Sequence, residues 1–237
     1  MSNTKLLGIG LIAFLLIGLV LKFQNHAPKT SVAPNQTAIR YLPLGDSYTI
    51  GESVADADRW PNQLVKRFAQ NGKRLEIVAN PSVTGYTTQD LIDRELPLVQ
   101  QLKPDFVTIL IGVNDYVQGV SAVTFEQHLD YIISSIQKQI PEPGNIALVT
   151  IPDYGKTPSG SQYSSPETSE AGIKAYNTII TQAGNKYNLT VADIFTASQK
   201  VVSDPSLIAD DGLHPSAKQY TDWTDIIYHA LESSKIP

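Results

Sequence analysis

Short, strongly apolar runs recur along the chain from residue 39, and each is followed by turn-forming residues. Most of these runs are continuously apolar and do not alternate with polar positions, which is typical of parallel strands covered on both faces of a sheet. The expected strands are Ile39–Leu44, Leu75–Ala79, Phe106–Ile111, Ile146–Ile151 and Thr190–Ile194.

The stretches between these runs repeat apolar residues every three or four positions, which predicts helices. They cover Pro61–Ala69, Thr88–Leu102, Thr124–Ile140, Glu167–Tyr187 and Ser216–Leu231. In the second helix Thr88 is the candidate N-cap, and we expect Pro97 to kink the helix or to end its regular part. Strands that alternate with helices predict βαβ units. The fold class is therefore α/β: a three-layer α/β/α sandwich with a central parallel sheet of about five strands.

The start of the chain has a different pattern. Residues Leu6–Leu21 form an uninterrupted apolar run flanked by Lys5 and Lys22. As a helix this run is about 24 Å long, a little short of the ~30 Å hydrocarbon core of a membrane. It is either an uncleaved membrane anchor or a cleaved signal peptide. We favour the anchor, because the best cleavage site, Ser31-Val32-Ala33, lies well beyond the run and is followed by Pro34.

Both interpretations export the rest of the protein. The anchor places it on the extracytoplasmic face of the cell membrane, and a cleaved signal peptide makes it a secreted protein. Residues 24–38 are polar, contain two prolines and show no periodicity, which is typical of a flexible tether. The expected organisation is an anchor or signal peptide (1–23), a tether (24–38) and one α/β domain (39–237).

Charge and cysteine content narrow the classes of function. The chain has 18 basic and 23 acidic side chains. Only three lysines precede residue 34, so the remainder carries 15 basic against 23 acidic groups. An acidic body lacks the cations that contact nucleic-acid phosphates, and we expect no nucleic-acid partner. The absence of cysteine excludes disulfides, thiolate metal sites and cysteine nucleophiles.

A serine follows the first expected strand. The apolar run ends at Gly45, and Ser47 comes two residues later. Ligands bind at the carboxyl ends of the strands in open α/β sheets, so we expect the Ser47 hydroxyl at that edge. A Gly-Asp-Ser sequence in a loop is usually only a turn. The significance of Ser47 therefore depends on partners further along the chain.

One of the four histidines has a setting suited to catalysis. His26 lies in the tether, His128 in a helix where we expect it to be solvated, and His229 in the last helix. His214 instead lies in the turn before the last helix, three residues after Asp211. A carboxylate at that distance in a sharp turn can orient an imidazole, as the acid of a serine triad does. The alternative is a capped helix entry without a catalytic role.

Two further loops follow expected strands. Asn80–Thr87 contains Gly85, which can bring its backbone N–H close to a ligand. The sequence Gly112-Val113-Asn114-Asp115 follows the third strand and offers the uncharged amide of Asn114 as a donor. Either loop alone is more often a simple turn. Together with Ser47 and His214, however, they place four candidate elements at strand ends or in the last loop.

These elements resemble the four conserved blocks of the SGNH (GDSL-type) hydrolases. The blocks are Gly45-Asp46-Ser47-Tyr48, Gly85 in its loop, Gly112-x-Asn114-Asp115 and Asp211-x-x-His214-Pro215, in the family's order. The layout is similar to the bacterial lysophospholipase/thioesterase branch. The resemblance implies a flavodoxin-like fold and an esterase or lipase activity without a cofactor. It further implies that residues 39–237 form an SGNH hydrolase domain.

The same resemblance implies a role for each matching residue. Ser47 would be the nucleophile, His214 the base and Asp211 the acid that orients it. The oxyanion hole would consist of the backbone N–H groups of Ser47 and Gly85 and the side chain of Asn114. No metal is implied.

The sequence departs from the family pattern at Tyr48, where leucine is usual, which is expected to alter packing beside the nucleophile. Thr49 occupies the second glycine of a Gly-x-Ser-x-Gly elbow, which argues against the larger α/β-hydrolase fold.

The expected function is hydrolysis of a carboxylic ester, with a small-molecule or lipid ester as substrate. A sugar O-acetylesterase and a non-catalytic module of the same fold are the alternatives. A metal-dependent phosphodiesterase is disfavoured, because the histidines are scattered. The Gly-, Ser- and Tyr-rich segment Asp153–Pro166 is either a wall or lid of the acyl pocket or a surface insertion. We expect a monomer that contacts the membrane through Leu6–Leu21.

Overall fold

The computed structural model describes residues 37–232, and its centre is a single sheet of five parallel strands in the order β2-β1-β3-β4-β5. The strands are β1 (Ile39–Gly45), β2 (Leu75–Ile77), β3 (Phe106–Leu110), β4 (Ile146–Val149) and β5 (Thr190–Ala192). The register pairs Leu44 of β1 with Ile109 of β3, and Leu148 of β4 with Val191 of β5. The expected parallel sheet is confirmed.

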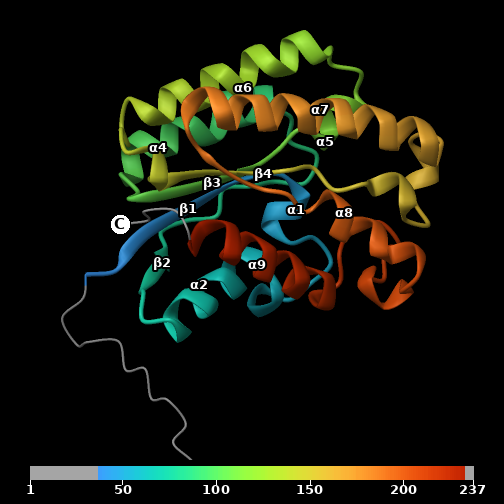
Figure 1. The fold of residues 1–237 in the computed structure, drawn as a ribbon, viewed down its shortest axis with the longest axis horizontal. Helices are drawn as coiled ribbons and strands as arrows, with labels where there is room; N and C mark the ends of the chain where they lie inside the picture. Colours follow the sequence, from blue (N-terminus) through green and yellow to red (C-terminus); the bar gives the residue numbers. More distant parts are fainter. Residues whose placement is uncertain (1–36, 233–237) are drawn as a thin grey trace, which may run out of the picture.

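Helices cover both faces of this sheet, which completes the three expected layers (Figure 1). One layer contains α4 (Leu96–Leu102), α5 (Val113–Val117), α6 (Ala122–Gln137) and α7 (Pro166–Tyr187). The opposite layer contains α2 (Trp60–Gln70) and α9 (Ala217–Glu232). Both layers cover buried strands, since every residue of β3 and β4 is buried. This burial explains why the strands are continuously apolar in the sequence.

The strands end one or two residues earlier than the apolar runs that predicted them. Ile111, Ile151 and Ile194 lie beyond the observed strand ends and are nevertheless at most 2% exposed. At Ile151 the side chain of Asn177 takes the place of a neighbouring strand, because it accepts from the Ile151 N–H (2.7 Å) and donates to its carbonyl (2.8 Å). Apolar sequence marks burial here, and strand pairing stops sooner.

The region expected to be one helix over 88–102 consists of three pieces. These are α3 (Thr88–Asp90), a π-helical turn η2 (Leu91–Glu95) and α4. The prediction of Thr88 as N-cap is wrong: Thr87 is the cap, in a capping box with Asp90. Pro97 lies in the first turn of α4, where its missing N–H is tolerated, directly after the π turn.

Three short helices directly follow strands or cap their ends, and the sequence pattern did not predict them. They are α1 (Ser47–Ile50), α5 and α8 (Phe195–Ser198). A helix of four or five residues is too short to show a 3.6-residue period, so only its capping residues reveal it.

The expected anchor and tether lie outside the described residues, apart from the last two tether positions. Among residues 37–232 no helix has the length and apolar character needed to cross a membrane.

Candidate active site

The turn from β1 into α1 presents Ser47 at the carboxyl edge of the sheet. Gly45 ends β1 at a position where a Cβ atom would lie 2.2 Å from the Leu110 carbonyl oxygen, so only glycine fits. Asp46 caps α1 by accepting the Tyr48 N–H through Oδ1 (3.0 Å). Ser47 is the first residue of α1 and is 5% exposed. The chain therefore reverses within two residues and leaves the serine beside a pocket.

Two carboxyl groups lie buried beneath this turn. Glu95, in the π-helical turn, accepts the Gly45 N–H through Oε2 (3.0 Å), and both Glu95 and Asp46 are fully buried. Burial raises the pKa of Asp46 to about 8 despite the hydrogen bond from Tyr48. Burial, opposed by the Gly45 hydrogen bond, also raises the pKa of Glu95 to about 8. Both carboxyl groups are therefore largely protonated at pH 7.

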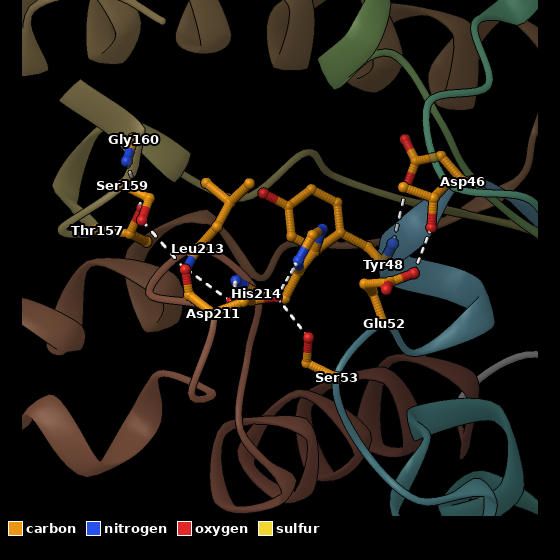
Figure 2. Close-up of polar contacts among 11 residues, drawn as sticks. Asp46, Tyr48, Glu52, Ser53, Thr157, Ser159, Gly160, Asp211, Leu213 and His214 are labelled. Atoms are coloured by element: carbon orange, nitrogen blue, oxygen red, sulfur yellow. Dashed lines mark hydrogen bonds and ion pairs between the residues drawn. The ribbon is translucent and has the colours of Figure 1, made fainter. Parts of the chain in front are cut away.

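The turn before α9 brings Asp211 and His214 together. Asp211 Oδ2 lies 2.7 Å from His214 Nδ1, and Asp211 Oδ1 accepts the N–H groups of Leu213 (2.8 Å) and His214 (2.9 Å) (Figure 2). Ser53 Oγ donates to Asp211 Oδ2 as well. Partial burial raises the pKa of Asp211, but the hydrogen bonds from Ser53, His214 and Leu213 outweigh it and hold that pKa below its usual range. The carboxylate is charged and has a fixed orientation.

Tyr48 packs against the imidazole of His214. The ring centroids are 5.6 Å apart with an interplanar angle of 63°, and on its other side Tyr48 lies 5.9 Å from the ring of Trp223 in α9. Tyr48 is the position at which the sequence departs from the usual leucine. The expected change in packing beside the nucleophile therefore includes an aromatic edge contact to His214.

The two loops expected to supply oxyanion donors meet at the same edge. Gly85 has a left-handed backbone with φ of 89°, and no heavy atom lies within 4 Å of the place where a Cβ would be. The Asn114 amide donates to the Tyr86 carbonyl (2.9 Å), which fixes the side chain and leaves a second N–H on the same nitrogen. Asn114 lies in the first turn of α5, directly after β3.

A buried hydrogen-bond network holds these loops together. Asp115 is fully buried and accepts from both the N–H (2.8 Å) and the hydroxyl of Thr88. Burial raises the pKa of Asp115, and the hydrogen bonds from Thr88 oppose that rise. The Thr88 hydroxyl also lies 2.8 Å from His128 Nδ1. The prediction that His128 is solvated is thus wrong, because this half-buried ring takes part in the network.

A pocket of about 210 Å³ lies where the four sequence blocks meet. Its walls are formed by Ser47, Thr84, Gly85, Val113, Asn114, Val117, Tyr154, Tyr163, Leu213 and His214. Four of the five predicted site residues therefore line one pocket, and the fifth, Asp211, binds His214 from behind it. Apart from His214, no lining residue is ionisable in the neutral pH range, and most of the lining surface is apolar.

The segment 153–166 forms one wall of the pocket. Tyr154 is 3% exposed and Tyr163 is 54% exposed, and their rings meet edge to face with centroids 6.1 Å apart. Ser159 connects the segment to the turn before α9, because its N–H donates to the Gly212 carbonyl (2.9 Å) and its hydroxyl to the Asp211 carbonyl (3.1 Å). Of the two interpretations of this segment, the structure supports a wall.

Three contacting residues were not found by sequence reasoning. Ser53 binds the carboxylate of Asp211, Glu52 accepts from the Thr84 hydroxyl, and Glu95 holds the Gly45 N–H. Their partners lie 158, 32 and 50 residues away along the chain. The only available signal was the position of Glu52 and Ser53 directly after the serine motif. Across residues 37–232, no three His, Cys, Asp or Glu side chains are grouped as ligands for a metal ion.

Comparison with known proteins identifies the family. The model of the GDSL-like lipase/acylhydrolase family matches residues 44–221, which include all four sequence blocks. The chain belongs to this family. As a GDSL-family member with esterase relatives it is a carboxylic ester hydrolase.

Its relatives are similar over most of their length. An arylesterase of Vibrio mimicus is 27% identical, over 77% of this chain and 83% of the relative. Thioesterase 1/protease 1/lysophospholipase L1 of Escherichia coli K12 is 25% identical, over 74% of each chain. The crystal structure of the lipase/acylhydrolase from Enterococcus faecalis superposes with a TM-score of 0.67 at 25% identity, covering 84% of this chain and 98% of that one.

Proposed function

We propose that this GDSL hydrolase is a serine esterase that cleaves its substrate through an acyl-enzyme on Ser47. The observation that supports this most strongly is the shared pocket: Ser47 and His214, far apart in sequence, line it together, and Asp211 holds His214 from behind. A serine hydroxyl, an imidazole and an orienting carboxylate are the parts that nucleophilic acyl transfer needs.

In the proposed reaction His214 acts as the base. Its Nδ1 faces Asp211, so Nε2 is the nitrogen that takes the Ser47 proton as Oγ bonds to the ester carbonyl carbon. The carbonyl π electrons move onto the oxygen, which becomes an oxyanion. When this intermediate collapses, the C–O bond to the alcohol breaks and the alcohol leaves with the proton from His214. Water then attacks the acyl-enzyme by the same steps in reverse order.

The N–H groups of Ser47 and Gly85 and the amide of Asn114 are the proposed donors to the oxyanion. Three donors fixed before the reaction stabilise the developing charge without reorganisation, and each such donor is typically worth about 10²–10³ in rate. The hydrogen bond from Asn114 to the Tyr86 carbonyl supports this role, because it restricts the amide to one orientation.

The proposed substrate is an ester with an uncharged, apolar acyl group, of the lipase, lysophospholipase or acylesterase type. Val113, Val117, Tyr154 and Leu213 supply apolar walls, and charged side chains that would favour an anionic substrate are absent from the pocket lining. The names of the relatives, an arylesterase and a thioesterase/lysophospholipase, agree with this substrate class. A panel of p-nitrophenyl esters, lysophospholipid and acetyl-xylan separates it from sugar O-acetyl esters.

Covalent labelling tests the nucleophile. A fluorophosphonate probe phosphonylates activated serines, so the wild-type protein is expected to be labelled and Ser47→Ala to remain unlabelled. Ser134→Ala is the matched control, since that hydroxyl donates to the Tyr131 carbonyl on α6. Labelling of Ser47→Ala at another serine, located by mass spectrometry, would show that the nucleophile is misassigned.

A further inference from the structure

The backbone at Ser53 has an unfavourable conformation directly after the nucleophile turn. Its φ of 64° lies in the left-handed region, which costs free energy for a residue other than glycine. The turn is fixed to Ser47, because the N–H groups of Gly51 and Glu52 both donate to the Ser47 carbonyl oxygen at 3.0 Å. Ser53 is thus held at a constant position relative to Ser47, in a conformation that favours glycine.

The Ser53 side chain reaches across to the other half of the site. Its Oγ donates to Asp211 Oδ2 at 2.5 Å, the same oxygen that contacts His214 Nδ1 at 2.7 Å (Figure 2). The other donors to this carboxylate, the N–H groups of Leu213 and His214, belong to the same turn as Asp211. Of these donors, only Ser53 comes from the segment that carries the nucleophile.

We propose that Ser53 is a positioning residue for ester hydrolysis: its hydroxyl fixes Asp211, and through it the His214 ring, to the turn that carries Ser47. The inference rests on the proposed function, since it presupposes Ser47 as nucleophile and His214 as base. Ser53 itself does not line the pocket and does not touch the reacting atoms.

The groups around the Asp211 carboxylate leave His214 as its reactive partner. The phenols of Tyr48 on α1 and Tyr220 on α9 also face this charge. Burial, followed by nearby negative charges that include Asp211, raises the pKa of both phenols well above the ordinary value, so both stay neutral. Glu52, beside Ser53, is turned to the Thr84 hydroxyl.

Two substitutions separate the hydroxyl from the backbone conformation. Ser53→Gly removes the hydroxyl and relieves the left-handed strain, whereas Ser53→Ala removes the hydroxyl and keeps the strain. If the hydroxyl positions Asp211, both variants lose about fivefold in kcat on a p-nitrophenyl ester, the effect of one ordinary hydrogen bond. KM changes less than kcat, because the substrate pocket is intact. Ser53→Gly also keeps the wild-type melting temperature.

The pH profile gives a second measurement. Without Ser53, Asp211 Oδ2 has one donor fewer and attracts a protonated His214 more strongly. The acid limb of kcat/KM is therefore expected to move to higher pH in both variants. The matched control is Ser206→Ala, which removes a hydroxyl bonded to Asp204 Oδ1 (2.6 Å), outside the pocket lining, and should leave both the rate and the limb unchanged.

Either of two results would overturn the proposal. One is wild-type kcat and pH profile in both Ser53 variants. The other is a loss of kcat in Ser53→Ala alone, because strain in the turn would then explain it. Failure of the proposed function looks different: Ser47→Ala would then keep activity and labelling, whereas failure of this inference alone leaves turnover dependent on Ser47.

Discussion

Glu95 shows at the scale of one residue how the nucleophile turn depends on a group that is costly to bury. Its Oε2 holds the Gly45 N–H, and its Oε1 has no hydrogen-bond partner among the described residues. Asp46 Oδ2, in the next residue of the turn, is also without a partner there. Ionising such a group in the interior is unfavourable, which is why the pKa of each is raised to about 8 by burial.

This burial predicts a pH-dependent effect of Glu95→Gln. Between pH about 4.5 and 8 the unfolded chain releases the Glu95 proton while the folded protein keeps it, so rising pH favours unfolding. Glutamine has no proton to lose and can still accept from Gly45. Relative to wild type, the unfolding free energy of the variant is expected to rise by about 2–4 kcal/mol between pH 5 and pH 8.

Urea unfolding at several pH values measures this difference. Glu142→Gln, at an exposed position, is the control for the loss of one negative charge. A difference between Glu95→Gln and wild type that stays constant from pH 5 to pH 8 would show that Glu95 is not held protonated.

At the scale of elements, the segment 153–166 determines the shape of the pocket. Its two 3-10 turns, Tyr154–Lys156 and Gly160–Gln162, place Tyr154 in the interior and Tyr163 at the rim. Tyr154 is supported from behind by α5, since the ring of Tyr116 lies 6.4 Å away. The wall of the pocket is therefore a packed aromatic surface, and Tyr163 is its outermost ring.

Tyr163→Ala is expected to change acyl-chain selectivity. Removal of this ring opens the pocket, so kcat/KM for octanoyl relative to acetyl p-nitrophenyl ester should rise at least about fivefold, the effect of roughly 1 kcal/mol of apolar contact. Tyr131→Ala on α6 is a matched control, because Tyr131 is 55% exposed, close to the 54% of Tyr163, and lies outside the pocket lining. An unchanged chain-length profile would exclude Tyr163 as a wall.

The element pattern was predictable from the sequence wherever burial is continuous. All five strands and the five long helical regions were found, because apolar runs and 3.6-residue periods extend over enough positions to be recognised. The strand ends were misplaced where a side chain replaces a strand, as Asn177 does at Ile151. The π turn before Pro97 also escaped prediction, because it shares the apolar spacing of an α-helix.

The site was predictable only in the residues that carry motifs. Ser47, Gly85, Asn114 and His214 follow strands or precede a helix, and the structure places them around one pocket. Ser53 had no such signal: a serine in a turn is ordinary, and its partner Asp211 is 158 residues away. The roles of the motif residues, the anchor at Leu6–Leu21 and the monomeric state stay predictions.

At the scale of the whole molecule, the two helical layers satisfy their buried tyrosines differently. Tyr176 on α7 is 4% exposed and donates its hydroxyl to the Val120 carbonyl. Tyr220 on α9 is fully buried, and its hydroxyl has no hydrogen-bond partner within residues 37–232. A buried hydroxyl without a partner costs free energy that a bonded one recovers.

These two tyrosines predict opposite effects of the same substitution on global stability. Tyr220→Phe removes an unsatisfied hydroxyl and should raise the free energy of unfolding by about 1 kcal/mol, whereas Tyr176→Phe leaves the Val120 carbonyl unpaired and should lower it by about 1 kcal/mol. Chemical denaturation at pH 7 compares the two variants directly. A loss of stability in Tyr220→Phe would mean that its hydroxyl has a partner after all.

The turn after α1 has a consequence for engineering by loop exchange. Glu52 binds the loop of Gly85 through Thr84, and Ser53 binds the loop of His214 through Asp211. A chimaera that imports only one of these loops from a relative breaks a contact made by a residue outside the graft. Transplanting substrate preference into this scaffold therefore requires that the donor loop and residues 52–53 be exchanged as one cassette.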